Sequence, residues 1–145
     1  MRISTRGRNA VKLMLDLATY DNGEPIKLKD IARRQNISDK YLEQIIAVLN
    51  KASLVKSVRG SQGGYRLCYS PQNYTVGQIL KTVEGSMSPT DCVGENGILC
   101  NKRATCVSVI IWEKLDNAIN DVLEGITLAD MVDWQNELSV SQYVI

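Results

Sequence analysis

Three of the four cysteines in this 145-residue chain stand close together, with the spacing Cys-x7-Cys-x5-Cys. They are Cys92, Cys100 and Cys106, and the segment 86–102 that holds the first two is rich in Ser, Pro, Gly and Asn. Three thiolates on one loop could converge on a soft metal or an iron–sulfur cluster. Structural zinc is the second choice. It usually takes four Cys or His ligands with one closely spaced Cys pair, and this segment has neither. Unrelated surface thiols, or one disulfide and an odd cysteine, are the simpler alternatives.

The absence of histidine limits the remaining chemistry. Histidine is the usual acid or base near neutral pH and the commonest neutral metal ligand. The chain also lacks the Cys-x-x-Cys motif of thiol redox enzymes. We therefore expect no enzymatic activity. The fourth cysteine, Cys68, falls in a predicted strand and is expected to be a small packed residue.

The net charge of +1 hides an uneven distribution along the chain. Residues 1–70 carry 13 Lys and Arg against 6 Asp and Glu, whereas residues 71–145 carry 4 against 10. The two halves therefore have net charges of +7 and −6. A basic half of this kind is expected to meet a polyanion such as nucleic acid, and the simpler alternative is a solvated basic face.

The basic half is expected to fold as three helices followed by a hairpin. Apolar residues recur with helical spacing after possible caps at Ser4 or Thr5 and at Ser38. Two β-rich runs, 54–59 and 65–69, flank a glycine-rich segment and predict a glycine-tipped hairpin. These glycines do not form a phosphate loop, because they lie between strands and no Lys-Ser/Thr pair follows them. The second and third helices have the short connection of a helix-turn-helix.

The acidic half is expected to hold helices on either side of a loop. Thr75 and Gln78 form a capping box for a short helix that Gly85 stops. The segment 86–102 has no apolar period and is predicted to be a loop. Apolar residues then recur over 107–124, which predicts a helix of about 20 residues, and a last short helix is expected from Thr127. The long helix has more apolar surface than one small core can cover, which favours self-association; intramolecular packing is the alternative.

The fold class follows from these elements: mainly α with a small β-hairpin, a winged helix-turn-helix plus a long dimerisation helix. We expect a DNA-binding region over 1–70, and a cluster-binding loop and dimerisation helix over 71–145. The 44% hydrophobic and 23% charged residues are typical of a globular chain. The apolar run 107–112 is too short for a membrane span, and the basic N-terminus is not followed by the apolar stretch of a signal peptide. The protein is therefore expected in the cytoplasm, without a membrane partner.

Helix three of such a fold would enter the major groove of duplex DNA, while the hairpin reaches the backbone or the minor groove. Arg59 stands at the foot of the hairpin, where a guanidinium could contact phosphate or a narrow minor groove. The residues expected to contact DNA are Arg2, Ser38, Lys40, Tyr41, Glu43, Gln44, Arg59 and Gly60.

Several strings of residues make the chain resemble a known family. They are residues 1–8, Ser38-x-x-Tyr41-Leu42-Glu43-Gln44, residues 54–60 with Gly63-Gly64-Tyr65, and Thr127-Leu128-Ala129-Asp130. Together they resemble the winged-helix regulators related to IscR, a family that also includes NsrR and CymR. The resemblance implies a homodimer that binds pseudo-palindromic DNA. It also implies that the three cysteines ligate an iron–sulfur cluster, 2Fe-2S by likeness to IscR or 4Fe-4S by likeness to NsrR.

The chain departs from this family in its fourth ligand. In IscR-type proteins a histidine follows the last cysteine by three residues, and here that position is Val109. We expect Glu43 to supply the fourth ligand and to couple the cluster to helix three, with Asp91 and Glu95 as alternatives. The second functional interpretation is a CymR-like repressor without a cluster, controlled by a partner protein, a metabolite or thiol oxidation.

Overall fold

Three hydroxyl side chains begin helices in the computed structural model, which describes residues 2–98 and 100–143. Ser4, Ser38 and Thr75 each accept a hydrogen bond, at 3.0, 3.2 and 3.0 Å, from the backbone N–H three residues further on. Each hydroxyl therefore satisfies a donor that the helix itself leaves free, which confirms the predicted caps. The helices are α1 (Thr5–Thr19), α3 (Asp39–Lys51) and α4 (Val76–Glu84).

The helix-turn-helix is formed by α2 (Leu28–Gln35) and α3. Asn36 ends α2 in the left-handed conformation, with φ 53°, and its N–H returns to carbonyls of the last turn. Ile37 then donates to the carbonyl of Ala32 at 3.0 Å, and Ser38 starts α3. The predicted turn is confirmed. The fully buried side chains that α1, α2 and α3 contribute to one core include Leu13, Met14, Ile31, Leu42, Ile45 and Leu49.

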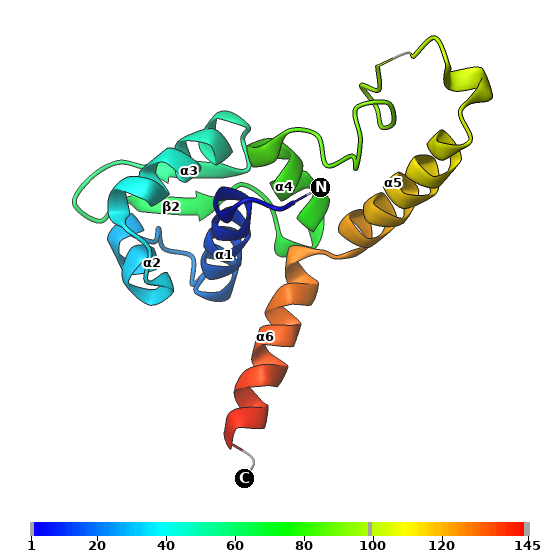
Figure 1. Ribbon diagram of the computed structural model, residues 1–145. Helices are drawn as coiled ribbons and strands as arrows, with labels where there is room; N and C mark the ends of the chain where they lie inside the picture. The colour runs from blue at the N-terminus through cyan, green and yellow to red at the C-terminus, as the bar shows by residue number, and fades with distance from the viewer. Residues whose placement is uncertain (1, 99, 144–145) are drawn as a thin grey trace.

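The wing is the antiparallel pair β1 (Val55–Val58) and β2 (Gly64–Leu67). Ile26, just before α2, exchanges two backbone hydrogen bonds with Tyr65 at 2.9 and 2.8 Å, so the wing is fixed to the helix-turn-helix. Gly64 is required for this approach, because a Cβ there would stand 2.4 Å from the Ile26 carbonyl oxygen. The predicted hairpin is confirmed, and Figure 1 shows it beside α2 and α3 at one end of the molecule.

The second half departs from the predicted elements at its end. A 3-10 turn (Pro71–Asn73) precedes α4, another (Arg103–Thr105) lies in the loop, and α5 (Ser108–Gly125) is the long helix. The last helix, α6 (Leu128–Tyr143), has 16 residues, so the prediction of a short helix is wrong. No Gly or Pro interrupts residues 128–143, and the helix continues although it has no strong apolar stripe. None of the described helices is long and apolar enough to cross a membrane.

A short antiparallel pairing joins α5 and α6 to the winged-helix lobe (residues 2–84). Val76 donates to the Ile126 carbonyl at 2.9 Å, and Leu128 donates to the Tyr74 carbonyl at 2.9 Å. Figure 1 shows the two helices leaving this joint in different directions. The core of the lobe includes side chains of α4 and the fully buried Leu128, so residues on both sides of position 70 pack together. The division into 1–70 and 71–145 stays a prediction.

Tyr74 connects this joint to the base of the wing. Its side chain is 0% exposed, its hydroxyl donates to the Leu54 carbonyl at 2.6 Å, and it accepts from the Tyr69 N–H at 3.0 Å. Burial raises the pKa of this phenol above its ordinary value. One side chain therefore satisfies a backbone acceptor and a backbone donor on the two sides of the hairpin.

We expect Tyr74→Phe to lower the free energy of unfolding by about 1–3 kcal/mol, because it leaves the Leu54 carbonyl and the Tyr69 N–H without their partner. Urea denaturation followed by circular dichroism measures the change. Tyr69→Phe is the matched control, since that ring is 57% exposed and its loss of a hydroxyl should change stability by less than about 0.5 kcal/mol. Equal stabilities of the two variants would contradict the role assigned to the Tyr74 hydroxyl.

Candidate nucleic-acid interface and cysteine loop

One face of α3 is polar and open to solvent. Lys40, Glu43 and Gln44 are exposed, and Leu42, Ile45 and their neighbours turn into the core on the opposite face. Side chains three and four residues apart share one face of a helix, so these residues form one continuous polar surface. We call it the reading surface, because it is predicted to contact DNA. Among the other predicted contacts, Ser38 is exposed at the start of α3 and Tyr41 is half-buried against the core.

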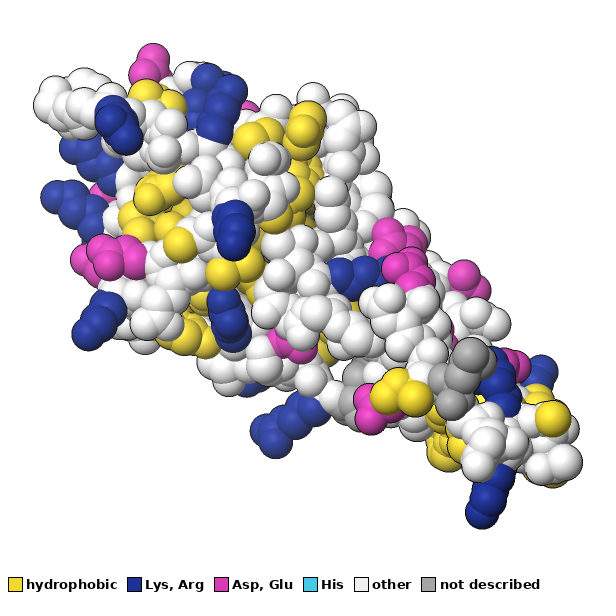
Figure 2. Space-filling model, turned by 90° about the horizontal axis from the view of Figure 1, so that it is seen from above, with side chains coloured by type: hydrophobic (Ala, Val, Ile, Leu, Met, Phe, Trp, Pro, Cys, Tyr) yellow, Lys and Arg dark blue, Asp and Glu magenta, His cyan; other side chains and the backbone are white. Residues whose placement is uncertain are grey.

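The wing tip and the N-terminal segment carry the remaining predicted contacts. Arg59 and Gly60 are exposed at the end of the hairpin, where Gly60 has φ 112° and accepts from the Gly63 N–H at 3.0 Å. Arg2 is exposed just before α1. Figure 2, which views the molecule from above, shows Lys and Arg side chains spread over the winged-helix lobe. Such an arrangement is suited to contacts with phosphates.

A buried ion pair positions the helix-turn-helix against α1. Asp16 is 2% exposed and receives two hydrogen bonds from the Arg34 guanidinium, at 2.7 and 3.0 Å, and one from Gln35 at 3.0 Å. The hydrogen bond to Asp16 raises the pKa of Arg34 above its ordinary value. The same guanidinium lies 4.1 Å from the centre of the Tyr20 ring. The sequence analysis missed this network, although Asp16 between the apolar residues Leu13 and Leu17 was a signal for it.

The three clustered cysteines differ in exposure. Cys92 is half-buried, its sulfur lies 3.1 Å from the Thr90 hydroxyl, and its carbonyl accepts from Arg103 at 2.6 Å. Cys100 and Cys106 are exposed, and none of the four cysteines forms a disulfide. Within residues 2–98 and 100–143, no group of three or more Cys, Asp or Glu stands close enough to hold a metal. The structure therefore presents free thiols on one loop and does not gather them into a set of ligands.

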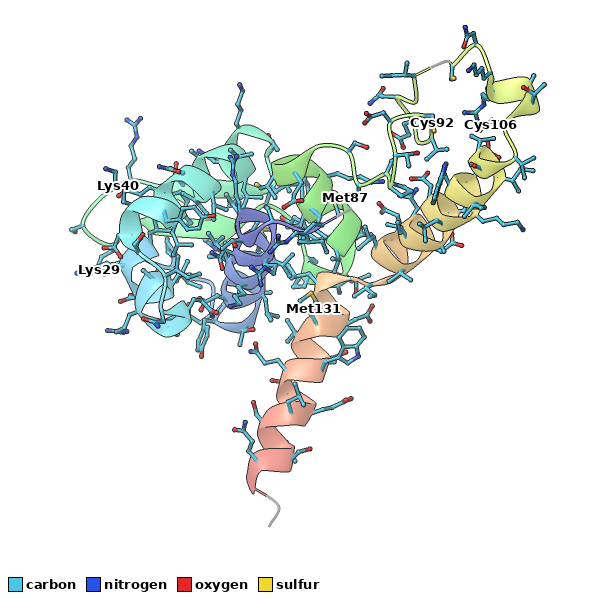
Figure 3. All side chains as sticks on the ribbon, in the orientation of Figure 1. Lys29, Lys40, Met87, Cys92, Cys106 and Met131 are labelled. Atoms are coloured by element: carbon cyan, nitrogen blue, oxygen red, sulfur yellow. The ribbon has the colours of Figure 1, made fainter. Side chains whose placement is uncertain are left out.

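The predicted oxygen ligands do not complete such a set. Figure 3 shows Lys40, on α3, at one end of the molecule and Cys92 and Cys106 at the other. Glu43 is exposed on α3, one helical turn after Lys40. Asp91 and Glu95 are exposed in the loop itself. Val109, at the position of the family's histidine, is 8% exposed and begins the packed side of α5.

The cysteine loop leaves the lobe next to the start of α1. Glu84, the last residue of α4, accepts from the Ser4 N–H at 2.8 Å and from the Ser4 hydroxyl. Gly7 leaves room for this carboxylate, because a Cβ there would stand 2.3 Å from its Oε1. The root of the loop therefore contacts the segment that carries Arg2. Sequence analysis missed this contact, because 80 residues separate Ser4 and Glu84.

Helix-turn-helix, wing and exposed basic surface together define a winged-helix DNA-binding protein. Residues 3–134 match the model of the Rrf2 family, which is described as an iron-dependent transcriptional regulator. The chain belongs to the Rrf2 family. It is a DNA-binding transcriptional regulator, and the family is not a class of enzymes.

Curated and solved relatives agree with this assignment. The transcriptional regulator IscR of Erwinia tasmaniensis is 40% identical over 97% of this chain and 84% of its own length. The solved structure of T. potens IscR superposes with a TM-score of 0.77 at 43% identity, covering 95% of this chain and 90% of that one. The structure of CymR, the global cysteine regulator of B. subtilis, has a TM-score of 0.76 at 36% identity, covering 92% and 98%. The predicted family and fold class are confirmed.

We expect Arg59→Ala to weaken binding to a duplex selected from a random pool by roughly 1–3 kcal/mol, because it removes a charged donor from the wing tip. Wild-type affinity should also fall steeply with salt, as phosphate contacts release counterions. Fluorescence anisotropy at several salt concentrations measures both effects. Lys114→Ala, which removes a positive charge from exposed α5, is the control and should bind as wild type. Unchanged binding by Arg59→Ala would remove the wing tip from the interface.

Proposed function

We propose that this regulator acts as a homodimer whose affinity for DNA, or choice of DNA site, depends on an iron–sulfur cluster bound by Cys92, Cys100 and Cys106. The observation that carries the proposal is the presence of three free thiols on one loop of an Rrf2-family chain. The IscR relatives support the same cofactor. A 2Fe-2S cluster is our first choice by likeness to IscR, and 4Fe-4S is the alternative.

The chemistry of the donors fits this cofactor. Thiolates are the usual ligands of iron–sulfur clusters, and all three thiols are free of disulfides. Cys100 and Cys106 are exposed, so the loop between Gly85 and α5 would close around the cluster when it binds. When bound, the cluster supplies a redox- and oxygen-sensitive group whose loss frees this loop.

Glu43 is our proposal for the fourth ligand and for the link to DNA. It is exposed on α3, the helix that carries Lys40 at the opposite end of the molecule from Cys92 and Cys106. Ligation by Glu43 would therefore require a cysteine loop to approach the reading surface. Without the cluster, its carboxylate would repel phosphate or accept from a cytosine amino group, and so restrict the sequences that are tolerated. Asp91 and Glu95 remain the alternatives within the loop.

The proposed dimer would use α5. Apolar side chains along this helix are exposed in the single chain: Val107 76%, Ile111 55%, Leu115 44% and Val122 59%. Their successive spacings of four, four and seven residues place them in one stripe. Rows of exposed apolar side chains on a helix are typical of subunit interfaces, and a two-fold dimer would present two α3 helices to a pseudo-palindromic site.

We expect Cys92→Ala, Cys100→Ala and Cys106→Ala each to lose most of the cluster, because each removes a thiolate ligand. Cys68→Ala is the matched control and should retain it, since Cys68 is half-buried directly after β2. Iron and sulfide analysis of anaerobically purified protein, with visible absorbance, measures the content and distinguishes 2Fe-2S from 4Fe-4S. Circular dichroism should show all four variants folded.

The same preparation separates the two functional interpretations. A coloured wild-type protein with equal cluster content in all four variants would contradict the assignment of the ligands. A colourless wild type after anaerobic reconstitution would overturn the cluster and favour the CymR-like alternative, with control by a partner, a metabolite or thiol oxidation.

We expect Leu115→Lys to weaken the dimer at least tenfold, because it would bury an unpaired ammonium in the interface. Asn117→Lys adds the same side chain to another side of α5 and is the control. Sedimentation equilibrium measures the dissociation constants. A monomeric wild-type protein, or equal dissociation constants for both variants, would contradict the proposed interface.

A further inference from the structure

A polar cavity lies between α5, the end of α4 and the cysteine loop. Its volume is about 870 Å³, and it opens to solvent. Cavities of this size are typical of small-molecule sites. In Figure 3 Met87 and Cys92 are labelled on the loop that runs from the end of α4 towards the start of α5. The cavity is lined by residues of α4, α5 and the loop and by none of α3. Cys92, a proposed cluster ligand, stands at its lining, whereas Asp116 takes no part in the contacts proposed above.

The cavity contains a buried carboxylate with an unused acceptor. Asp116 of α5 is 7% exposed and lines the cavity; its Oδ2 accepts from the Asn120 side chain at 3.3 Å, whereas its Oδ1 has no hydrogen-bond partner among the described residues. A buried charged oxygen without a donor is costly, and most such groups in folded proteins are paired. The free oxygen therefore indicates that a donor is to be supplied from outside the chain.

The charges around the cavity favour a cation. Among the described residues of its lining, three acids, Glu95, Glu113 and Asp116, face two bases, Lys81 and Arg103. Both bases already have partners: Lys81 pairs with Glu124 at 3.1 Å, and Arg103 pairs with Glu113. Of the three acids, Asp116 is the buried one, and its unpartnered Oδ1 is left to bind a positive group.

The rest of the lining favours an organic cation over a metal ion. Ser88, Asn117 and Asn120 add side-chain oxygens that can accept from an N–H donor, while the buried Met87 and Val93 supply apolar surface. A single metal ion would leave most of this volume empty, and the described residues gather no set of three acidic or thiol ligands. We propose that the cavity binds a small aliphatic compound with a primary ammonium group, which donates to Asp116 while its carbon chain packs on Met87 and Val93.

Such a ligand would join the first part of the cysteine loop to α5. Met87 and Val93 stand in the loop, and Asp116 stands in the helix, so one molecule would hold both. The proposed ligand contacts differ from those of the cluster: the ammonium group binds Asp116, and Cys92, although it lines the cavity, is not needed as a donor. Two sources share the required chemistry, free amino acids and aliphatic amines, and the experiment distinguishes them.

The test is isothermal titration of the 145-residue chain with n-butylamine, putrescine, L-norvaline and, as the uncharged control, n-butanol. Binding of at least one ammonium compound with no binding of butanol is the expected result; norvaline alone would identify amino acids as the source, and the amines alone would identify aliphatic amines. Asp116→Asn should weaken that binding roughly tenfold or more, because it removes a charge-assisted hydrogen bond. The control Asp121→Asn, at an exposed position of the same helix, should not.

Thermal melting without ligand gives a second readout. Asp116→Asn should melt higher than wild type, because an unpaired buried amide costs less than an unpaired carboxylate. Absence of binding by every ammonium compound, equal losses in the two variants, or thermal stabilisation by Mg²⁺ or Zn²⁺ with none by amines would overturn the proposal. Cluster content, measured separately by iron analysis, does not enter any of these outcomes.

Discussion

The backbone pairing between Tyr74–Val76 and Ile126–Leu128 is the constraint on which the arrangement of this regulator depends. Two hydrogen bonds of 2.9 Å fix the start of α4 to the turn between α5 and α6. Thr75 reinforces the joint, because its hydroxyl caps α4 and also donates to Glu124 at 2.8 Å. That hydrogen bond, together with Lys81, holds the pKa of Glu124 below its ordinary value, so the carboxylate stays charged at neutral pH.

Two sets of contacts connect the joint and the loop to the wing and the N-terminal segment, which are predicted to contact DNA. Tyr74 leads from the joint to the base of the wing through the Leu54 carbonyl and the Tyr69 N–H. Glu84 leads from the root of the cysteine loop to Ser4, two residues after Arg2. A change in the loop or in α5 therefore has direct structural neighbours on the wing and the N-terminal segment. These contacts give our proposal of cluster-dependent DNA binding a physical basis. Loss of the cluster can affect DNA binding through them only if it alters the geometry of these hydrogen bonds.

Local signals allowed much of the DNA-binding fold to be predicted from the sequence. Caps at Ser4, Ser38 and Thr75 act within one helical turn, and the glycines of the wing meet a steric demand that neighbouring strands impose. Contacts between distant segments were not predictable in this way. Asp16 with Arg34, Tyr74 with Leu54 and Ser4 with Glu84 each depend on how complete elements pack. The length of α6 was missed because its residues lack the apolar period by which a helix is recognised in sequence.

The cysteines illustrate the same limit at the candidate site. Their spacing indicates a shared function, but the geometry of three side chains on a loop depends on what the loop encloses. In the structure the loop holds its thiols apart, and in the proposed cluster-bound form it would bring them together. The apolar stripe on α5 shows the same limit. The sequence predicts that these side chains are buried against another surface, but in our proposal that surface belongs to a second chain.

The central claim is that cluster occupancy alters the reading of DNA. Duplexes selected from a random pool by cluster-loaded and by cluster-free protein should be titrated anaerobically against both forms, with fluorescence anisotropy as the readout. Our account predicts that removing the cluster changes the affinity for at least one of the two selected classes about tenfold, with a smaller change or none for the other. Equal affinities of the two forms for every duplex, with the cluster shown to be present in the loaded protein, would contradict it.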